Sequence, residues 1–233
     1  MRFRPSIALT LCAVISFIIL CGLGTWQLQR LAWKNGLIEQ VAARMDADPV
    51  PLPVSIDTPD DWRFRQVSVA GTFVHDGEAH RTGKASAGEI GYRIFTPLQR
   101  PDGTVVMVER GWVPGPKKQV SARAGSQPEG LQTVTGVLRL PDPRNSFTPD
   151  DDPVGNMWFA SDPRAMAAAA GLTAPAWYVV AAESPGQWPR AGRPELNLRN
   201  NHLEYAFTWF SLAAILAVIW VMMGLRRGRE LDQ

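Results

Sequence analysis

The residue with the clearest chemical potential is His202, one of only three histidines among 233 residues. A helix with 3.6 residues per turn would place on one face Arg199, His202, Tyr205, Ala206 and Trp209. An imidazole with aromatic rings below it and a cation above it could hold a flat, metal-bearing ligand edged with carboxylates, such as a haem. The alternative is that Tyr and Trp mark a membrane interface and that the histidine is simply hydrated there.

The element that must position His202 is an apolar segment near the end of the chain. Residues 206–225 form a run of 20 residues without a charge, and a helix of that length crosses a hydrocarbon layer of roughly 30 Å. A second apolar segment lies near the start, where residues 5–29 carry no charge. Its apolar region is longer than that of a signal peptide and no Ala-x-Ala site follows, so we predict an uncleaved transmembrane helix over residues 6–25.

Arginines beyond the two apolar segments indicate their orientation. They are Arg2, Arg4, Arg226, Arg227 and Arg229. Because basic residues stay on the cytoplasmic side, we expect residues 1–5 and 226–233 in the cytoplasm and residues 26–205 outside. In a bacterium this places the main domain in the periplasm and the helices in the inner membrane. A mitochondrial location would put it in the intermembrane space, but no Ser/Arg-rich transit segment precedes the first helix.

The outer region divides into three predicted parts. Apolar residues at steps of 3 and 4 indicate that the first helix continues as an extension over residues 26–47. Residues 54–184 form a β-rich domain, and residues 185–197 form a Pro/Gly-rich linker back to the membrane. Arg30 and Lys34 lie on one side of the extension, where lipid phosphate or a ligand carboxylate would lie opposite them.

Alternating apolar positions predict the strands of the β-rich domain. The predicted strands are 67–73, 92–98, 104–108, 134–140, 156–160 and 177–182. One short helix interrupts them, since Asp162 can cap it, Pro163 suits its first turn and Gly171 can end it. We therefore expect an α+β membrane protein in which two terminal transmembrane helices flank a mostly antiparallel β domain, either a small barrel or a sandwich.

The most metal-like cluster of the outer region runs from His75 to His80 and also contains Asp76 and Glu78. Two imidazoles and two carboxylates could bind zinc, but Asp76-Gly77 favours a turn, and no further His or Cys outside the helices completes a site. We interpret this cluster as a solvated turn.

Other functional classes find little support in the sequence. No nucleophile–base pair and no motif for a metalloprotease, a dinucleotide or covalent haem attachment occurs, so we expect no enzyme. The net charge of +2 is too small and too dispersed to indicate nucleic-acid binding.

Four segments, taken in order along the chain, carry a resemblance to a known family. They are GTWQLQRLAWK at 24–34, FRQVSVAGTF at 64–73, the stretch from GY at 91 to ERGWVP at 114, and NNHLEYAFTWF at 200–210. Each is weak by itself, but this order between two terminal apolar segments is specific. Over nearly its whole length the sequence resembles the surfeit locus protein 1 family of cytochrome c oxidase assembly factors.

The resemblance implies a membrane protein that helps to build haem–copper oxidases. Bacterial members are thought to bind haem a and to assist its insertion into the catalytic subunit of cytochrome c oxidase. That subunit, the haem a synthase and the lipid bilayer are therefore the implied partners. His202 matches the second-helix histidine of the family, which is proposed as a haem ligand.

From this resemblance we expect a haem a site at the outer membrane boundary. His202 would be the axial iron ligand, Tyr205 and Trp209 would line the ring, Trp26 would close the pocket from the first helix, and Arg199 would pair with the carboxylates. The alternative is a cofactor-free scaffold that brings the oxidase subunit and the synthase together, in which His202 only anchors the interface between the helices.

Overall fold

The computed structural model describes residues 3, 5–84, 88–184, 186–192 and 200–230. The chain forms two compact units, one made of residues 1–40 and 197–233 and the other of residues 41–196. The first unit is a pair of helices and the second is a β domain.

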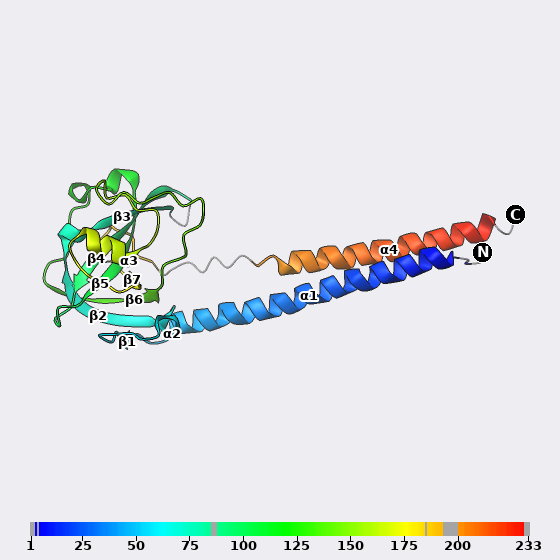
Figure 1. Ribbon diagram of the computed structural model, residues 1–233, viewed down its shortest axis with the longest axis horizontal. Coiled ribbons are helices and arrows are strands. Elements are labelled where there is room, and N and C mark those ends of the chain that lie inside the picture. Colours follow the sequence, from blue (N-terminus) through cyan, green and yellow to red (C-terminus); the bar gives the residue numbers. More distant parts are fainter. Residues whose placement is uncertain (1–2, 4, 85–87, 185, 193–199, 231–233) are drawn as a thin grey trace. The chain divides into compact units, whose positions relative to one another are not determined.

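The helix pair consists of α1, Ile7–Asp46, and α4, His202–Glu230, which lie side by side (Figure 1). Both are long and apolar enough to cross a membrane. Helix α1 continues beyond the first apolar segment without a break to Asp46. Helix α4 begins at His202 itself, so the histidine occupies the first turn of the helix rather than a preceding loop.

Small residues bring the two helices close together. Ala206 and Ala213 of α4 are only 1% and 3% exposed. A Cβ atom on Gly24 of α1 would lie 2.7 Å from the ring of Phe210, so only glycine leaves room for that ring. Further along the pair, the indole nitrogen of Trp220 donates a hydrogen bond of 3.2 Å to the hydroxyl of Thr10. Close contact of this kind is typical of helix pairs in membranes.

The β domain contains one mixed sheet of seven strands. The strands are β1 Val50–Pro51, β2 Gln66–Phe73, β3 Ala79–Lys84, β4 Ile90–Gln99, β5 Val105–Pro114, β6 Leu131–Arg139 and β7 Tyr178–Ala181. Their order is β1-β2-β6-β7-β5-β4-β3, and β2 also pairs with β4. This extra pairing joins Thr72 to Gln99 and Phe73 to Leu98, so that β2, β6, β7, β5 and β4 close into a small barrel.

Most neighbouring strands are antiparallel, as expected, and the parallel pairs are β1–β2 and β5–β7. The hairpin of β4 and β5 is the longest pairing of the sheet and contains an irregularity. Ile94 pairs with Gly111 and Phe95 pairs with Glu109, so Arg110 opposes no residue of β4. An extra residue of this kind is a β-bulge, which bends its strand and re-aims a side chain.

Two buried clusters lie on opposite faces of the sheet. Alternate residues of the strands form the first cluster, which includes Val67, Leu98, Val108 and Val179. The intervening residues, such as Phe95, Met107 and Tyr178, pack with Met166 and Ala167 of α3, Pro163–Ala169. The predicted cap of this helix is confirmed, since the carboxylate of Asp162 accepts hydrogen bonds from the backbone N–H groups of Arg164 and Ala165.

Among the described residues, the domain also contains the short helix α2, Pro59–Trp62, and three 3₁₀ turns. The turns are His75–Gly77, Gly115–Lys117 and Val120–Ala122. The last turns of α1 also belong to this unit. Val41 and Met45 pack against Val137, and the side-chain amide of Gln66 donates a hydrogen bond of 2.7 Å to the carbonyl of Met45.

One predicted strand of this domain is wrong, and one observed strand was missed. Residues 156–160 form isolated bridges, such as Arg81 to Trp158, instead of the predicted strand. Strand β3 was not predicted, because residues 79–84 carry four polar side chains and one glycine and lack the alternation of a half-buried strand. Of the predicted linker over 185–197, residues 185 and 193–197 lie outside the described residues.

Candidate functional site

The side chain of His202 is held between the two helices of the first unit. Its Nδ1 atom lies 2.7 Å from the side-chain oxygen Oε1 of Gln27 on α1. Beside it, the amide of Asn200 donates a hydrogen bond of 2.8 Å to the side-chain oxygen of Asn35. Polar side chains therefore connect α4 to α1 around the first turn of α4.

This hydrogen bond determines which nitrogen of His202 is available to a metal. The amide oxygen of Gln27 only accepts hydrogen bonds, so Nδ1 carries the proton. The neutral imidazole then has its lone pair on Nε2. A metal-bound histidine usually donates its other N–H to a fixed acceptor in the same manner. With Nδ1–H as the donor to Gln27, Nε2 is the ring nitrogen of His202 that could bind a metal.

The aromatic residues of the predicted site lie in different surroundings. Tyr205 is 55% exposed, and Trp209 is half-buried one further turn along α4. Trp26 is 48% exposed on α1, where the guanidinium carbon of Arg30 lies 6.0 Å from its ring and 5.0 Å from the ring of Trp33. Arg199 lies outside the described residues.

The close packing of the helices limits where a flat ligand can lie. Below His202, Ala206 is buried and Gly24 is in contact with the ring of Phe210. A porphyrin ring could not be inserted between α1 and α4 at that level without separating them. The exposed side chains of Tyr205 and Trp26 would instead leave the ring against the outer surface of the helix pair.

Gln27 is a functional candidate that the sequence interpretation missed. It forms a hydrogen bond with a residue 175 positions away, and its partner depends on the register of two helices. One signal was present, because Gln27 is a strongly polar side chain near the end of a charge-free apolar segment, where such residues are often functional.

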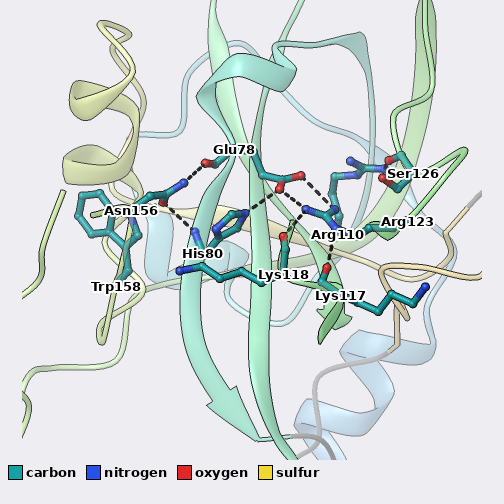
Figure 2. Close-up of polar contacts among 9 residues, drawn as sticks. All are labelled: Glu78, His80, Arg110, Lys117, Lys118, Arg123, Ser126, Asn156 and Trp158. Carbon is teal, nitrogen blue, oxygen red and sulfur yellow. Dashed lines mark hydrogen bonds and ion pairs between the residues drawn. The ribbon is translucent and has the colours of Figure 1, made fainter. Parts of the chain in front are cut away.

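A second polar centre lies in the β domain and is shown in Figure 2. The carboxylate of Glu78 accepts a hydrogen bond of 2.8 Å from Nε2 of His80 and forms an ion pair with the guanidinium of Arg123. The Arg123 side chain is 0% exposed and also donates to the backbone carbonyls of Lys117 and Lys118. The network therefore joins β3 to the 3₁₀ turns that follow β5.

Burial and hydrogen bonding act in opposite directions on Glu78. Burial alone would raise the pKa of this carboxyl, but the hydrogen bonds from His80 and Arg123 outweigh burial and hold its pKa below the ordinary value of 4.5. The charged form of Glu78 is therefore the one that the folded domain favours.

The interpretation of residues 75–80 as a solvated turn is wrong for its second half. Residues 75–77 do form a 3₁₀ turn, but Glu78 and His80 are buried on or next to β3. The sequence could not reveal this, because the stabilising partner, Arg123, comes from a loop 45 residues away. Within the described ranges, no group of three His, Cys, Asp or Glu side chains could hold a metal ion.

Comparisons with known proteins agree with the resemblance of the four segments. The model of the SURF1 family matches residues 14–214. A SURF1-like protein of Monosiga brevicollis is 33% identical over 226 residues, covering 91% of this chain and 86% of that protein. Surfeit locus protein 1 of Mus musculus and of Homo sapiens are each 34% identical, covering 88% of this chain and 72% and 74% of the respective proteins. The chain belongs to the SURF1 family.

Proposed function

We propose that this protein assists the assembly of a haem–copper cytochrome c oxidase by carrying haem a to the catalytic subunit. Membership of the SURF1 family and two helices able to cross a membrane support a role in membrane-bound assembly. The observation that carries the haem part of the proposal is the state of His202. Its Nδ1 is engaged by Gln27, which leaves Nε2 with the lone pair that binds iron.

The surroundings of His202 suit a ligand that is held and then released. Trp26 and Tyr205 offer exposed aromatic surface, and Trp209 is partly accessible one turn below. A haem held by His202 against the outside of the helix pair would stay accessible to the receiving protein. Arg199 precedes α4 and would pair with the carboxylates, with Arg30 as a second cation.

The proposed location follows from the charge distribution. Both tips of the chain lie in the cytoplasm, the helices lie in the bacterial inner membrane, and the β domain faces the periplasm. There the β domain would contact the oxidase subunit and the haem a synthase. A fusion of alkaline phosphatase within the β domain, after Gln187, tests this orientation. The fusion should be active, and an inactive fusion with an intact chain would place the domain in the cytoplasm.

Replacement of the histidine tests haem binding. His202→Ala should remove the haem a absorption band from protein purified out of cells that make haem a, while the far-UV circular dichroism stays unchanged. His75→Ala is the matched control, because His75 belongs to the β domain and bonds the carbonyl of Pro128. An unchanged haem a spectrum in His202→Ala, together with full oxidase assembly, would disprove the assignment.

A scaffold without a cofactor is the second candidate, and the same hydrogen bond supports it. A histidine that bonds Gln27 across the helix pair can act as an anchor with no metal involved. In that case the wild-type protein would show no haem band after mild purification. His202→Asn, which can still donate to Gln27, would then preserve oxidase assembly, whereas the haem carrier would lose its activity with the same substitution.

A further inference from the structure

The β domain contains a cleft that the proposed haem chemistry does not use. The cleft has a volume of about 370 Å³ and lies next to the end of β7. Its walls come from β2, β5 and β6 and from the chain that follows β7. The residues that matter here are Phe73, Arg110, Val134, Glu183 and Ser184.

Arg110 is the unusual member of this cleft. It is only 3% exposed, and its Nη2 atom donates to the backbone carbonyl of Ser126. Its Nη1 atom is buried and has no hydrogen-bond partner. Among the described residues, no carboxylate forms an ion pair with this guanidinium.

The charge of Glu78 raises the pKa of Arg110, but the ion pairs of Glu78 are with Arg123 and His80 and not with Arg110. Figure 2 shows the side chain of Arg110 next to Arg123, and Glu78 is already engaged by Arg123 and His80. Burial lowers the pKa of Arg110 to about 10, which still leaves it protonated at neutral pH. A buried cation with a free N–H is costly unless an anion approaches it.

The backbone directs this side chain into the cleft by a specific device. Arg110 is the bulge residue of β5, and Gly111 after it has a φ of +130°. A Cβ atom at Gly111 would collide with the backbone carbonyl of Arg190, so glycine is required there. Bulges of this kind often lie beside binding sites because they re-aim a side chain.

The other lining groups restrict the type of anion. The hydroxyl of Ser184 is a second buried donor without a partner, and it lines the same cleft. The ring of Phe73 lies 4.9 Å from the guanidinium carbon of Arg110, and Val134 adds further apolar wall. The exposed carboxylate of Glu183 would repel a dianion such as phosphate more strongly than a monoanion.

We propose that this cleft binds a small organic carboxylate, which accepts hydrogen bonds from Nη1 of Arg110 and the hydroxyl of Ser184 and places its apolar body against Phe73 and Val134. The ligand carboxylate would supply the hydrogen-bond acceptor that Nη1 of Arg110 lacks among the described residues. This site belongs to the β domain alone and does not depend on haem binding by His202.

Calorimetric titration of the full-length protein in detergent micelles with benzoate tests the proposal. Benzoate should bind saturably, with one site per chain. Benzamide has the same shape but no charge, so it should bind at least about tenfold more weakly because the charge-assisted hydrogen bond is lost. Inorganic phosphate should also bind at least about tenfold more weakly, because Glu183 repels the dianion. Micelles without protein correct for partitioning. Absence of saturable binding, equal affinity for benzamide, or tighter binding of phosphate would overturn the proposal.

Variants locate the site. Arg110→Gln should weaken benzoate binding at least about tenfold, whereas Arg139→Gln, which removes a partly exposed arginine on β6, should not change it. The Arg110→Gln result counts only if the circular dichroism of the variant matches that of the wild type. Because this variant could fail to fold, two milder substitutions test the same cleft. Ser184→Ala should weaken binding, and Glu183→Gln should tighten it because a repelling charge is removed. Unchanged affinity in both would overturn the assignment of benzoate to this cleft.

Discussion

Gln27 on α1 fixes the ring of His202 on α4 through one hydrogen bond of 2.7 Å, although the residues are 175 positions apart. The contact sets the tautomer of the imidazole and its rotation about the side-chain bonds. The orientation of the His202 ring therefore depends on how α1 and α4 are aligned, and not on α4 alone.

Removing this acceptor should weaken haem binding. Gln27→Leu should lower the affinity for haem by about 10- to 100-fold, because Nδ1–H loses its partner and the ring loses its fixed orientation. Gln27→Glu should keep or increase the affinity, since a carboxylate is a stronger acceptor. Absorption titration with haem measures both variants. Gln29→Leu, an exposed neighbour on α1, is the control, and equal affinity in Gln27→Leu and the wild type would contradict the role of Gln27.

The contact of Gly24 with Phe210 should control the stability of the helix pair. Gly24→Ala places a methyl group 2.7 Å from the Phe210 ring, and overpacking of this kind costs about 1–3 kcal/mol. Gly22→Ala is a closely matched control, because a Cβ atom there meets no atom within 4 Å. Unfolding in mixed micelles, followed by tryptophan emission, should show a lower free energy of unfolding for Gly24→Ala and an unchanged one for Gly22→Ala. Equal stability of the two variants would mean that the helices do not pack at Gly24.

Breaking the ion pair of Glu78 and Arg123 should lower the free energy of unfolding of the β domain more than breaking an exposed ion pair. Glu78→Gln leaves the fully buried guanidinium of Arg123 without its counter-charge, which should destabilise the domain by about 3–5 kcal/mol. Asp142→Asn removes the partner of Arg139 at 3.6 Å, but the Asp142 side chain is 78% exposed, so the loss should stay below about 1 kcal/mol. Thermal unfolding followed by near-UV circular dichroism measures both. A similar loss of stability in Glu78→Gln and Asp142→Asn would mean that burial does not make the Glu78–Arg123 ion pair the more important one.

The same carboxylate makes the domain sensitive to acid. The folded-state pKa of Glu78 lies below its ordinary value of 4.5, so its contribution to stability is present above pH 4.5 and is lost as the pH falls through the folded-state pKa. The difference in stability between the wild type and Glu78→Gln should therefore be constant near neutral pH and shrink in acid. A difference that grew as the pH fell would reverse the sign of this linkage.

Local patterns in the sequence were sufficient for much of the fold. The alternation of Val67, Val69 and Phe73 predicted β2, and Asp162 with Pro163 predicted the start of α3. The choice between barrel and sandwich remained open. The closure of the sheet depends on the two residue pairs that join β2 to β4, and no local pattern specifies such contacts.

In the candidate sites too, helical spacing predicted which residues share a face, but it did not predict their partners from distant parts of the sequence. The face of α4 that carries His202 and Trp209 followed from helical spacing alone. The partners Gln27 and Arg123 did not, because each meets its counterpart only when segments far apart in the sequence come together. The role of Arg110 depends on a bulge whose position is visible only in the pairing of β4 with β5.

The order of elements along the chain has a consequence for biosynthesis. Gln27 is made early and His202 late, and the whole β domain is synthesised between them. A ribosome that stops anywhere in that interval releases a chain that has Gln27 but lacks His202. Only a chain that extends through α4 can thus form the Gln27–His202 pair, so truncated products lack this link between the two helices.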